Sequence, residues 1–391
     1  MIRKTIVEQF LSHREKFGER VLVHRHWLHQ HPELAFAEKE TTNYIMKQLE
    51  HVGIPYKQIG TCGLYADLLA DSSYPTIAIR AEIDGLPVKE ETGLPFASIY
   101  DGKMHACGHD ANTAIVLTLA EVLAEEKQNL KCNVRFIFEP AEEIGEGANY
   151  MIQHGALENP KPEEILLFHF GNETRDTVEI NRKISTAQIA GLQIAIKGRA
   201  SHFSQYDEGI DAMYAASKLI TAAREINERV TVEYPFILGF GLMQAGSSGN
   251  IVAERAELKG SLRTFTKKDF EILYGEFIQK VREIELETGA DIQVEITKII
   301  PPIINDDNMV EHACEIGQYL GRKHFQVVDE PFLAGDNAAY YLEEIPGLHV
   351  VFMAKKEGEA TYPIHNSRFD LDEKEIIKAL EFLLAFVVSS F

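Results

Sequence analysis

Two metal-binding residue types stand close together in the segment MHACGHD, which runs from Met104 to Asp110. Cys107 offers a thiolate and His109 an imidazole, and both groups are common ligands of transition-metal ions. Side chains at positions i and i+2 lie on one face of an extended segment, so this pair can share a metal site if the segment is extended. A buried thiol followed by a helix-capping Asp110 explains the same residues, so this motif alone leaves a structural role equally open.

Glu142 and Glu143 are a second chemical signal, because adjacent carboxylates repel each other unless a cation lies nearby. They follow an apolar run over residues 133–138 and precede two glycines, Gly145 and Gly147. With a cation bound, one carboxylate can act as a ligand and the other as a general base. Taken alone, the segment is better interpreted as a solvated acidic loop, because the whole chain is acidic.

The strands of an α/β domain with a mainly parallel sheet would position these groups, since helical and extended patterns alternate through the first half of the chain. Apolar runs predict strands over residues 76–83, 133–138, 164–168 and 348–353. The polar residues that follow these runs, directly or after a short loop, are Asp84, Glu142 with Glu143, His169 and His365. Open α/β sheets bind ligands at the carboxyl ends of their strands, so we expect these side chains to converge.

This convergence predicts a mixed set of sulfur, nitrogen and oxygen ligands, namely Cys107, His109, Glu143, His169 and His365. Such a set suits Zn²⁺ or Mn²⁺, whereas Ca²⁺ and Mg²⁺ prefer oxygen ligands. A single zinc ion usually takes three or four protein ligands, so the larger set predicts two ions about 3.5–4 Å apart with a bridging water. Glu142 would take a proton from this water and return it to a leaving amine, while a metal ion polarises the scissile carbonyl.

Other interpretations of these residues stay open. Cys107 acting as a nucleophile needs a histidine base held against it, and no local signature of cysteine hydrolases surrounds it. A metal-binding scaffold that has lost its reaction is an alternative of another class, although the intact Glu142 argues against it. The histidine-rich cluster from Arg25 to Glu33 has no supporting ligand spacing, and we interpret it as a partly buried helix end.

Between about Ile184 and Lys298 the pattern changes to the order βαββαβ. Its second helix, over residues 268–288, carries apolar residues every three or four positions and so presents one buried face. Such a unit matches a ferredoxin-like sheet of four strands with two helices. Because the α/β pattern resumes after two prolines, we expect an inserted domain, residues 184–298, within a catalytic domain formed by residues 1–183 and 299–391.

Composition limits the class of protein. Of the 391 residues, 45% are apolar and 25% are charged, as is usual for globular chains. The formal net charge of -21, without any basic run, argues against a nucleic-acid partner. The longest apolar runs fall short of the roughly 20 residues that a membrane span needs. Four scattered cysteines predict reduced thiols, and the N-terminus lacks the pattern of a secretory signal, so we expect a cytoplasmic protein.

Motifs spread over almost the whole chain share their order and spacing with one family: LHQHPEL (28–34), RAEIDGLPVKEETG (80–93), KMHACGHD (103–110), FEPAEE (138–143), GRASH (198–202), GSLRT (260–264) and IHNSRFDLDE (364–373). The chain resembles the M20 metallopeptidase clan, and within it the amidohydrolase branch of hippurate hydrolases, auxin-conjugate hydrolases and N-acetyldiaminopimelate deacetylases. This resemblance implies a catalytic domain with two metal ions and an inserted lid domain that also forms a homodimer.

The resemblance also implies a role for individual residues. The five candidate ligands match the metal ligands of the family, Glu142 matches its catalytic base, and Asp84 matches a residue that orients His109. The lid residues that match the family's substrate-binding groups are His202, Asn250 and Arg263. His202 corresponds to a residue that reaches the substrate carbonyl or carboxylate, often across the dimer, and the other two correspond to carboxylate-binding groups.

The implied reaction is metal-dependent hydrolysis of the amide bond of an N-acyl amino acid, most of all an N-acetyl one. The motifs look most like those of N-acetyldiaminopimelate deacetylases of lysine biosynthesis, while a broad aminoacylase, a hippurate-type hydrolase or a dipeptidase would use the same residues. Three departures from the family pattern bear on specificity, namely Glu82 in place of Asp, Asn112 in place of His, and Asp336, Asn337 and Ala338 in place of a Glu-Asp-Phe turn. The last is expected to reshape the pocket floor.

Overall fold

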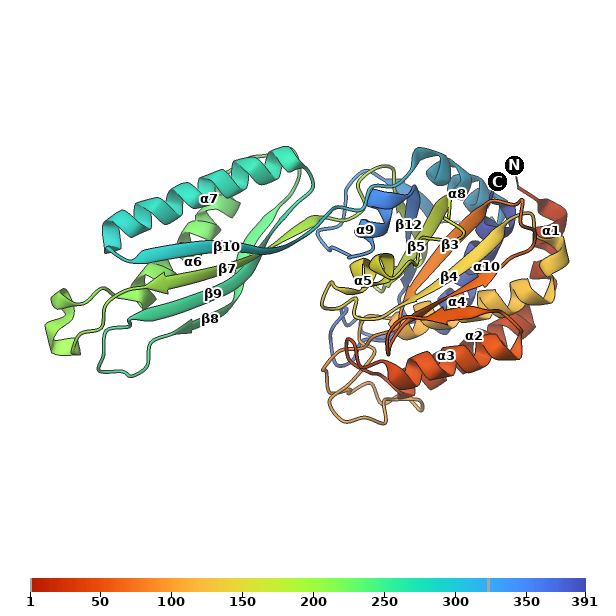
Figure 1. The fold of residues 1–391 in the computed structure, drawn as a ribbon, viewed down its shortest axis with the longest axis horizontal. Coiled ribbons are helices and arrows are strands. Elements are labelled where there is room, and N and C mark those ends of the chain that lie inside the picture. Colours follow the sequence, from red (N-terminus) through yellow and green to blue (C-terminus); the bar gives the residue numbers. More distant parts are fainter. Residues whose placement is uncertain (1, 322–323) are drawn as a thin grey trace. The chain divides into compact units, whose positions relative to one another are not determined.

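The computed structural model describes residues 2–321 and 324–391, which form two compact units (Figure 1). Unit 1 contains the chain up to Ser185 together with residues 304–330 and 337–391, and unit 2 contains residues 186–303 and 331–336. The sequence did not anticipate that the short segment 331–336 returns to unit 2. Within the described ranges, no helix is long and apolar enough to cross a membrane.

A sheet with the strand order β1-β2-β4-β3-β5-β12-β6-β11 forms the centre of unit 1. Its strands are β1 (Tyr56–Gln58), β2 (Leu64–Leu68), β3 (Thr76–Glu82), β4 (Asn133–Glu139), β5 (Glu164–Gly171), β6 (Arg175–Asn181), β11 (His324–Val328) and β12 (Gly347–Ala354). The α/β class is confirmed. The expectation of a mainly parallel sheet holds for the central strands β4, β3, β5 and β12, whereas β2 pairs antiparallel with β1 and β4, and β6 with β12.

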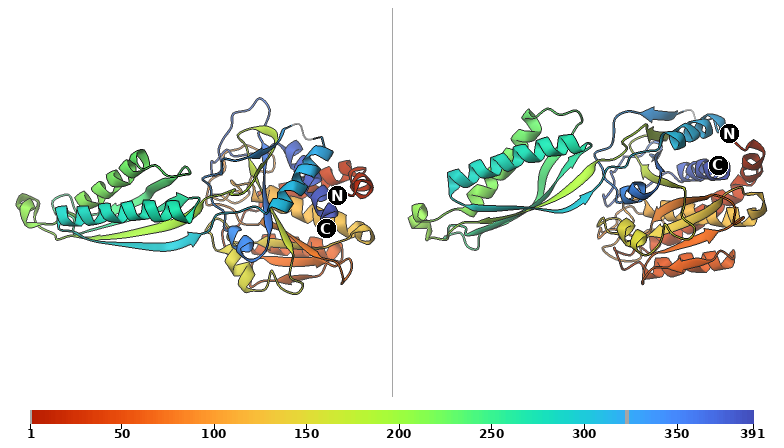
Figure 2. Two further views of the ribbon diagram at one scale, coloured as in Figure 1. Left: turned by 90° about the horizontal axis from the view of Figure 1, so that it is seen from above. Right: turned by 45° about the horizontal axis from the view of Figure 1, so that its top comes forward.

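The helices of unit 1 are α1 (Lys4–Leu11), α2 (Arg14–Gln30), α3 (Lys39–His51), α4 (His109–Glu125), α5 (Gly147–Gln153), α8 (Asp307–Tyr319), α9 (Ala339–Glu344) and α10 (Glu373–Ser389), with a 3-10 turn at Lys127–Asn129. Helix α4 packs on the sheet on one side and on α2 on the other, which explains why it is buried from His109 to Leu123. Helix α10 packs against α4, α8 and β12, and the chain ends lie side by side (Figure 2).

Unit 2 is an antiparallel sheet with the order β10-β7-β9-β8, and α6 and α7 cover one of its faces (Figure 2). Its elements are β7 (Gln188–Lys197), a 3-10 segment at Phe203–Glu208, α6 (Ala212–Arg229), β8 (Ile237–Ala245), β9 (Arg255–Thr264), α7 (Lys267–Thr288) and β10 (Asp291–Ile300). The expected βαββαβ order is confirmed. Helix α7 buries one stripe, Leu273, Phe277, Val281 and Ile284, against the sheet, as its apolar spacing predicts.

The central parallel strands of unit 1 deliver polar residues to one edge of the sheet. Asp84 follows β3, and the segment with Glu142 and Glu143 follows β4. The expected position of His169 just past a strand end is wrong, because β5 continues to Gly171. The cause is β12, which pairs with β5 as far as Met353 and Gly171 and so keeps His169 within the sheet.

Candidate metal centre

Cys107 and His109 lie where the chain turns into α4. Gly108 between them has a left-handed backbone with φ 94°, a conformation that glycine adopts without strain. The His109 ring is fixed through Nδ1, which lies 2.9 Å from the backbone oxygen of Asp84 and 3.2 Å from its Oδ1. Such a contact sets both the tautomer and the direction of a metal-binding histidine, and it leaves Nε2 available as the ligand atom.

His169 reaches the same place from β5. Its Nδ1 lies 2.9 Å from the backbone oxygen of Phe170, and its Nε2 lies 3.5 Å from Cys107 Sγ. Cys107, His109 and His169 thereby offer three ligand atoms that all lie within 4.8 Å of one another. Two near neighbours in the sequence and a histidine 62 positions after Cys107 therefore form one group that has the geometry to hold a metal ion.

Glu142, Glu143 and His365 complete the cluster. The backbone N–H of Glu143 donates to Asp84 Oδ2 over 3.0 Å, and Glu143 Oε2 lies 3.4 Å from His365 Nε2. Glu142 Oε2 lies 3.9 Å from His109 Nε2. Cys107, Glu143 and His365 form a second group within 4.8 Å, and His109, Glu142 and Glu143 form a third. The structure thus brings all the candidate ligands and the candidate base together.

Two buried atoms of this cluster test whether a cation fits. His109 Nε2 and Glu143 Oε1 are inaccessible to solvent and have no hydrogen-bond partner among the described residues. Buried polar atoms are rarely left unpaired, because each loses its hydration without compensation. A cation held by the sulfur, nitrogen and oxygen atoms of this cluster would satisfy both, and such a mixed set suits Zn²⁺ or Mn²⁺. The residues present therefore fit a metal centre.

The pKa values of Cys107 and His109 also indicate that a cation fits this cluster. Burial raises the pKa of the Cys107 thiol well above its ordinary value. Burial alone would lower the pKa of His109, but its charge interaction with Cys107 and its hydrogen bond to Asp84 outweigh this effect and raise it. A thiolate is the form that binds metal, so a nearby cation is needed to stabilise it in this buried place. The same burial disfavours Cys107 as a free nucleophile, although His169 lies close enough to be its base.

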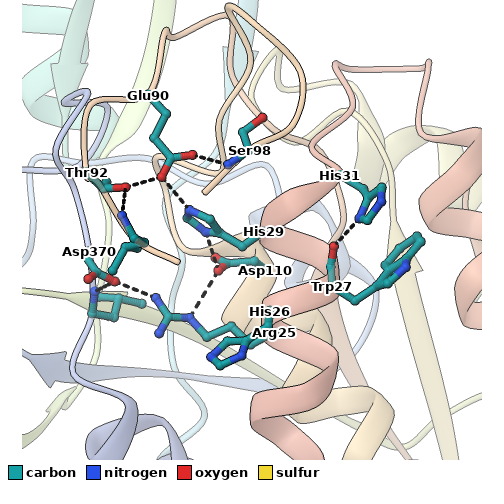
Figure 3. A network of polar contacts seen from close by, with 12 residues as sticks. Arg25, His26, Trp27, His29, His31, Glu90, Thr92, Ser98, Asp110 and Asp370 are labelled. Atoms are coloured by element: carbon teal, nitrogen blue, oxygen red, sulfur yellow. Dashed lines mark hydrogen bonds and ion pairs between the residues drawn. The ribbon is translucent and has the colours of Figure 1, made fainter. Parts of the chain in front are cut away.

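The residue after His109 is held by two residues from α2, as Figure 3 shows. Asp110 Oδ2 lies 2.9 Å from His29 Nδ1 and 3.3 Å from Arg25 Nε, and Arg25 also donates to Asp370 over 2.7 Å. Burial would lower the pKa of His29, but the Asp110 carboxylate overrides this effect and raises it to about 9. The histidine-rich cluster is confirmed as a helix end, and Asp110 forms buried ion pairs where the sequence suggested a cap.

These α2 residues are ones that sequence reasoning missed as supports of the site. Both hold Asp110 at the start of α4, which carries His109, and Arg25 also holds Asp370 in the segment after His365. His29 Nε2 also lies 3.2 Å from Glu90, which accepts from the backbone of Ser98 and so anchors a long loop (Figure 3). The sequence shows that Arg25 and His29 lie on one helix, but it does not show their partners, because these lie far away in the sequence.

The three departures from the family pattern meet around one buried arginine, Arg80. Its guanidinium donates to Glu82, to both carboxylate oxygens of Glu139 at 2.9 and 3.0 Å, and to Asn337 Oδ1 at 3.1 Å. Asn112 Nδ2 in turn donates to Glu82 Oε2 over 2.8 Å. Glu82, Asn112 and Asn337 therefore belong to one hydrogen-bonded network around Arg80, and none of them is among the candidate ligand groups.

The three expected substrate-binding residues lie in unit 2. His202 and Asn250 are exposed neighbours, because the backbone N–H of Phe203 donates to the oxygen of Asn250 over 3.0 Å. Arg263 lies on β9 and donates to the backbone oxygen of Leu333 over 2.8 Å. Burial lowers the pKa of its guanidinium. Their role toward a substrate therefore stays a prediction.

Comparison with known proteins identifies the family of the chain. Residues 78–389 match the profile of peptidase family M20/M25/M40. Two Bacillus subtilis (strain 168) proteins, N-acetyl-L-cysteine deacetylase and N-acetylcysteine deacetylase, are 34% and 32% identical to the chain over 92% and 95% of its length, which is 85% and 97% of theirs. The crystal structure of the Bacillus subtilis YXEP protein, described as a dinuclear metal binding peptidase from the M20 family, superposes with a TM-score of 0.81 at 31% identity, covering 96% of this chain and 98% of that one. The chain therefore belongs to peptidase family M20/M25/M40 and is a hydrolase of that family.

Proposed function

We propose that the protein hydrolyses the amide bond of N-acetyl amino acids with the help of two divalent metal ions. The observation that carries this proposal is the cluster of candidate ligands with an adjacent second carboxylate, Glu142, at the carboxyl edge of the parallel strands. The named relatives support the acetyl group and an amino acid, because both are N-acetylcysteine deacetylases. The ligands in this proposal are Cys107, His109, Glu143, His169 and His365.

The reaction divides between the metal ions and Glu142. Bound Mn²⁺ or Zn²⁺ would polarise the scissile carbonyl and make water a stronger nucleophile. Glu142 accepts a proton from the attacking water as the bond from its oxygen to the acyl carbon forms. It then donates that proton to the amide nitrogen as the carbon–nitrogen bond breaks, which releases acetate and a free amino acid. Asp84 keeps His109 oriented throughout.

The amino acid part of the substrate has two candidates. N-acetylcysteine is the substrate named for the relatives, and N-acetyl-L,L-diaminopimelate, with a place in lysine biosynthesis, is the substrate that the sequence motifs suggest. In this proposal His202, Asn250 and Arg263 bind the carbonyl or carboxylate of the substrate, because an arginine fork suits a carboxylate. A cytoplasmic location stays a prediction.

A panel of substrates tests this function. Purified protein is supplied with Mn²⁺, Zn²⁺ or a chelator and incubated with N-acetylcysteine, N-acetyldiaminopimelate, N-acetylmethionine, hippurate and a dipeptide, and the released amine is quantified. We expect metal-dependent turnover of N-acetyl substrates. Turnover restricted to N-acetyldiaminopimelate would assign lysine biosynthesis, and equal turnover of hippurate or the dipeptide would contradict acetyl selectivity. No turnover despite bound metal would favour a silent scaffold.

Unit 2 also has a surface that suits a second copy of the chain. Strand β8 is an edge strand, since it pairs only with β9 in the sheet of unit 2, and edge strands pair readily with other chains. Leu242 and Met243 on β8 are exposed, as are Met213 and Tyr214 on the adjacent helix α6. We infer that two copies form a homodimer by pairing their β8 strands around a twofold axis, which joins the same surface on both copies.

Pairing through β8 predicts which substitutions dissociate the dimer. Sedimentation of the wild type at micromolar concentration should give a dimer, and the double variant L242K/M243K should give a monomer, because each edge would then carry buried like charges. The matched control is T297K on β10, the opposite edge of the same sheet, which should remain dimeric. A monomeric wild type, or a dimeric double variant, would refute pairing through β8.

A further inference from the structure

The loop that carries Glu142 and Glu143 has an unusual backbone immediately before them. Ala141 has φ 58°, a left-handed conformation that residues with a side chain rarely adopt. Such a conformation persists only where the surroundings enforce it. The direction in which the chain leaves Ala141 sets the position of Glu142, so whatever enforces this conformation also positions the proposed general base.

Ala141 is held on both sides of its peptide. Its carbonyl oxygen accepts hydrogen bonds from the backbone N–H groups of Glu146 and Gly147, each over 3.2 Å. Its own N–H donates to Oε1 of Glu38 over 2.8 Å. The first contacts are local to the loop, whereas Glu38 lies about a hundred residues earlier in the chain. Among the described side chains, only that of Glu38 accepts a hydrogen bond from the Ala141 N–H.

Glu38 is itself firmly placed. Its side chain has no exposure to solvent, and it precedes the first residue of α3. The backbone oxygen of Glu38 accepts from the N–H of Thr42 over 3.0 Å and from its hydroxyl, and that hydroxyl accepts from the N–H of Gly63 over 3.0 Å. Burial of a carboxyl group is costly, so a fully buried glutamate with a defined partner indicates a specific task.

Two other buried side chains hold the ends of the same loop. Arg80 grips the carboxylate of Glu139 at its start, and Asp84 accepts the N–H of Glu143 beyond its bend. Glu38 holds the point between these two anchors where the backbone reverses. Removing its acceptor would free the bend while both ends stay attached, so the expected damage is a displaced Glu142 rather than an unfolded loop.

From this geometry we propose that Glu38 is a positioning residue, whose carboxyl oxygen fixes the backbone of Ala141 and thereby holds Glu142 in its working position. The proposal rests on the proposed function, in which Glu142 is the general base. Positioning requires only a hydrogen-bond acceptor opposite the Ala141 N–H. A glutamine side chain has the same length and a carbonyl oxygen, so it should serve as well as the carboxyl group. An aspartate keeps the charge but withdraws the acceptor by about 1.5 Å.

The test compares Glu38→Gln, Glu38→Asp and Glu38→Ala with the wild type. We expect Glu38→Asp and Glu38→Ala to lower kcat roughly 10- to 100-fold, because small displacements of catalytic groups have effects of this size. KM and the number of bound metal ions should stay close to wild type, and Glu38→Gln should retain kcat within about threefold. The matched control is Glu40→Gln, an exposed neighbour whose carboxylate accepts from Tyr100.

Amide hydrogen exchange of the peptide covering residues 139–147 provides a readout that does not depend on the reaction. In metal-free protein, exchange should accelerate in Glu38→Asp and Glu38→Ala but not in Glu38→Gln or Glu40→Gln. A wild type without hydrolytic activity would refute the proposed function and leave this exchange result to decide the backbone role of Glu38. Unchanged exchange and kcat in Glu38→Ala, a Gln variant as impaired as the Ala variant, or loss of metal in proportion to kcat would overturn the positioning role.

Discussion

Replacing Glu142 with glutamine is expected to abolish most of the hydrolytic activity while leaving the metal ions bound. The glutamine side chain keeps the size of glutamate and a carbonyl oxygen, but it cannot take a proton from water or deliver one to the leaving amine. General acid–base catalysis typically contributes roughly 10²- to 10⁴-fold, so kcat should fall by that amount. KM should change little, because the lost interaction belongs to the transition state.

The measurement separates a base from a ligand. Glu142 Oε2 lies 3.9 Å from His109 Nε2, and one of the three ligand groups includes Glu142. If Glu142 were a ligand, the Gln variant would lose metal together with activity. Metal content determined by elemental analysis after dialysis should therefore stay at the wild-type value in Glu142→Gln, and its loss would contradict the proposed division of labour.

A matched control comes from the same loop. Glu146→Gln makes the same chemical change at an exposed position next to the N-terminus of α5, outside the candidate ligand groups. Its kcat should stay within about twofold of wild type. Equal turnover by Glu142→Gln and wild type would exclude Glu142 as the proton carrier and favour a mechanism in which another group activates water.

The convergence of the candidate site residues could be predicted from the sequence because the positions of strand ends follow local rules. Runs of apolar residues locate the strands, and polar residues just beyond β3 and β4 must meet at one edge of a parallel sheet. The sulfur, nitrogen and oxygen atoms of these residues then favour ions such as Zn²⁺ or Mn²⁺. His169 is the instructive exception, because the end of β5 depends on pairing with β12, nearly two hundred residues later, and no local pattern encodes that partner.

The supports of the site could not be predicted, for the same reason. Arg25 and Arg80 are fully buried charges. Apart from Glu82, which lies on the same strand as Arg80, their carboxylate partners lie between 59 and 348 residues away in the sequence. A sequence pattern records that such residues occur on a helix or a strand, but the partner that compensates a buried charge is chosen by the tertiary fold. Glu38 gives no signal at all, since its partner is a backbone N–H.

The second large effect concerns Cys107, which, like His109 and Glu143, belongs to two of the three candidate ligand groups. It joins His109 and His169 in one group and Glu143 and His365 in the other. A substitution that removes a ligand from both groups should weaken the binding of both metal ions, whereas loss of His365 should weaken the binding of only one. We therefore expect Cys107→Ala to retain fewer metal ions after dialysis than His365→Ala, which should retain about half of the wild-type content. Both variants should lose activity.

Three measurements check this ordering. Elemental analysis gives the metal content, thermal unfolding with and without Mn²⁺ gives the stabilisation, and amine release gives the rate. A ligand present at 100 times its dissociation constant stabilises a protein by about 2.7 kcal/mol, so the metal-induced rise in Tm should disappear in Cys107→Ala. Cys314→Ala removes a thiol on α8, outside the ligand groups, and should behave as wild type.

Chelation distinguishes this metal centre from a cysteine nucleophile. Under the proposed mechanism a chelator abolishes turnover and Mn²⁺ or Zn²⁺ restores it. A nucleophilic Cys107, with His169 as its base 3.5 Å away, would instead remain active without metal and be inactivated by alkylation. Burial raises the pKa of this thiol, so an uncoordinated Cys107 is protonated and slow to alkylate at neutral pH. Metal-free turnover that alkylation abolishes would therefore overturn the assignment of Cys107 as a ligand.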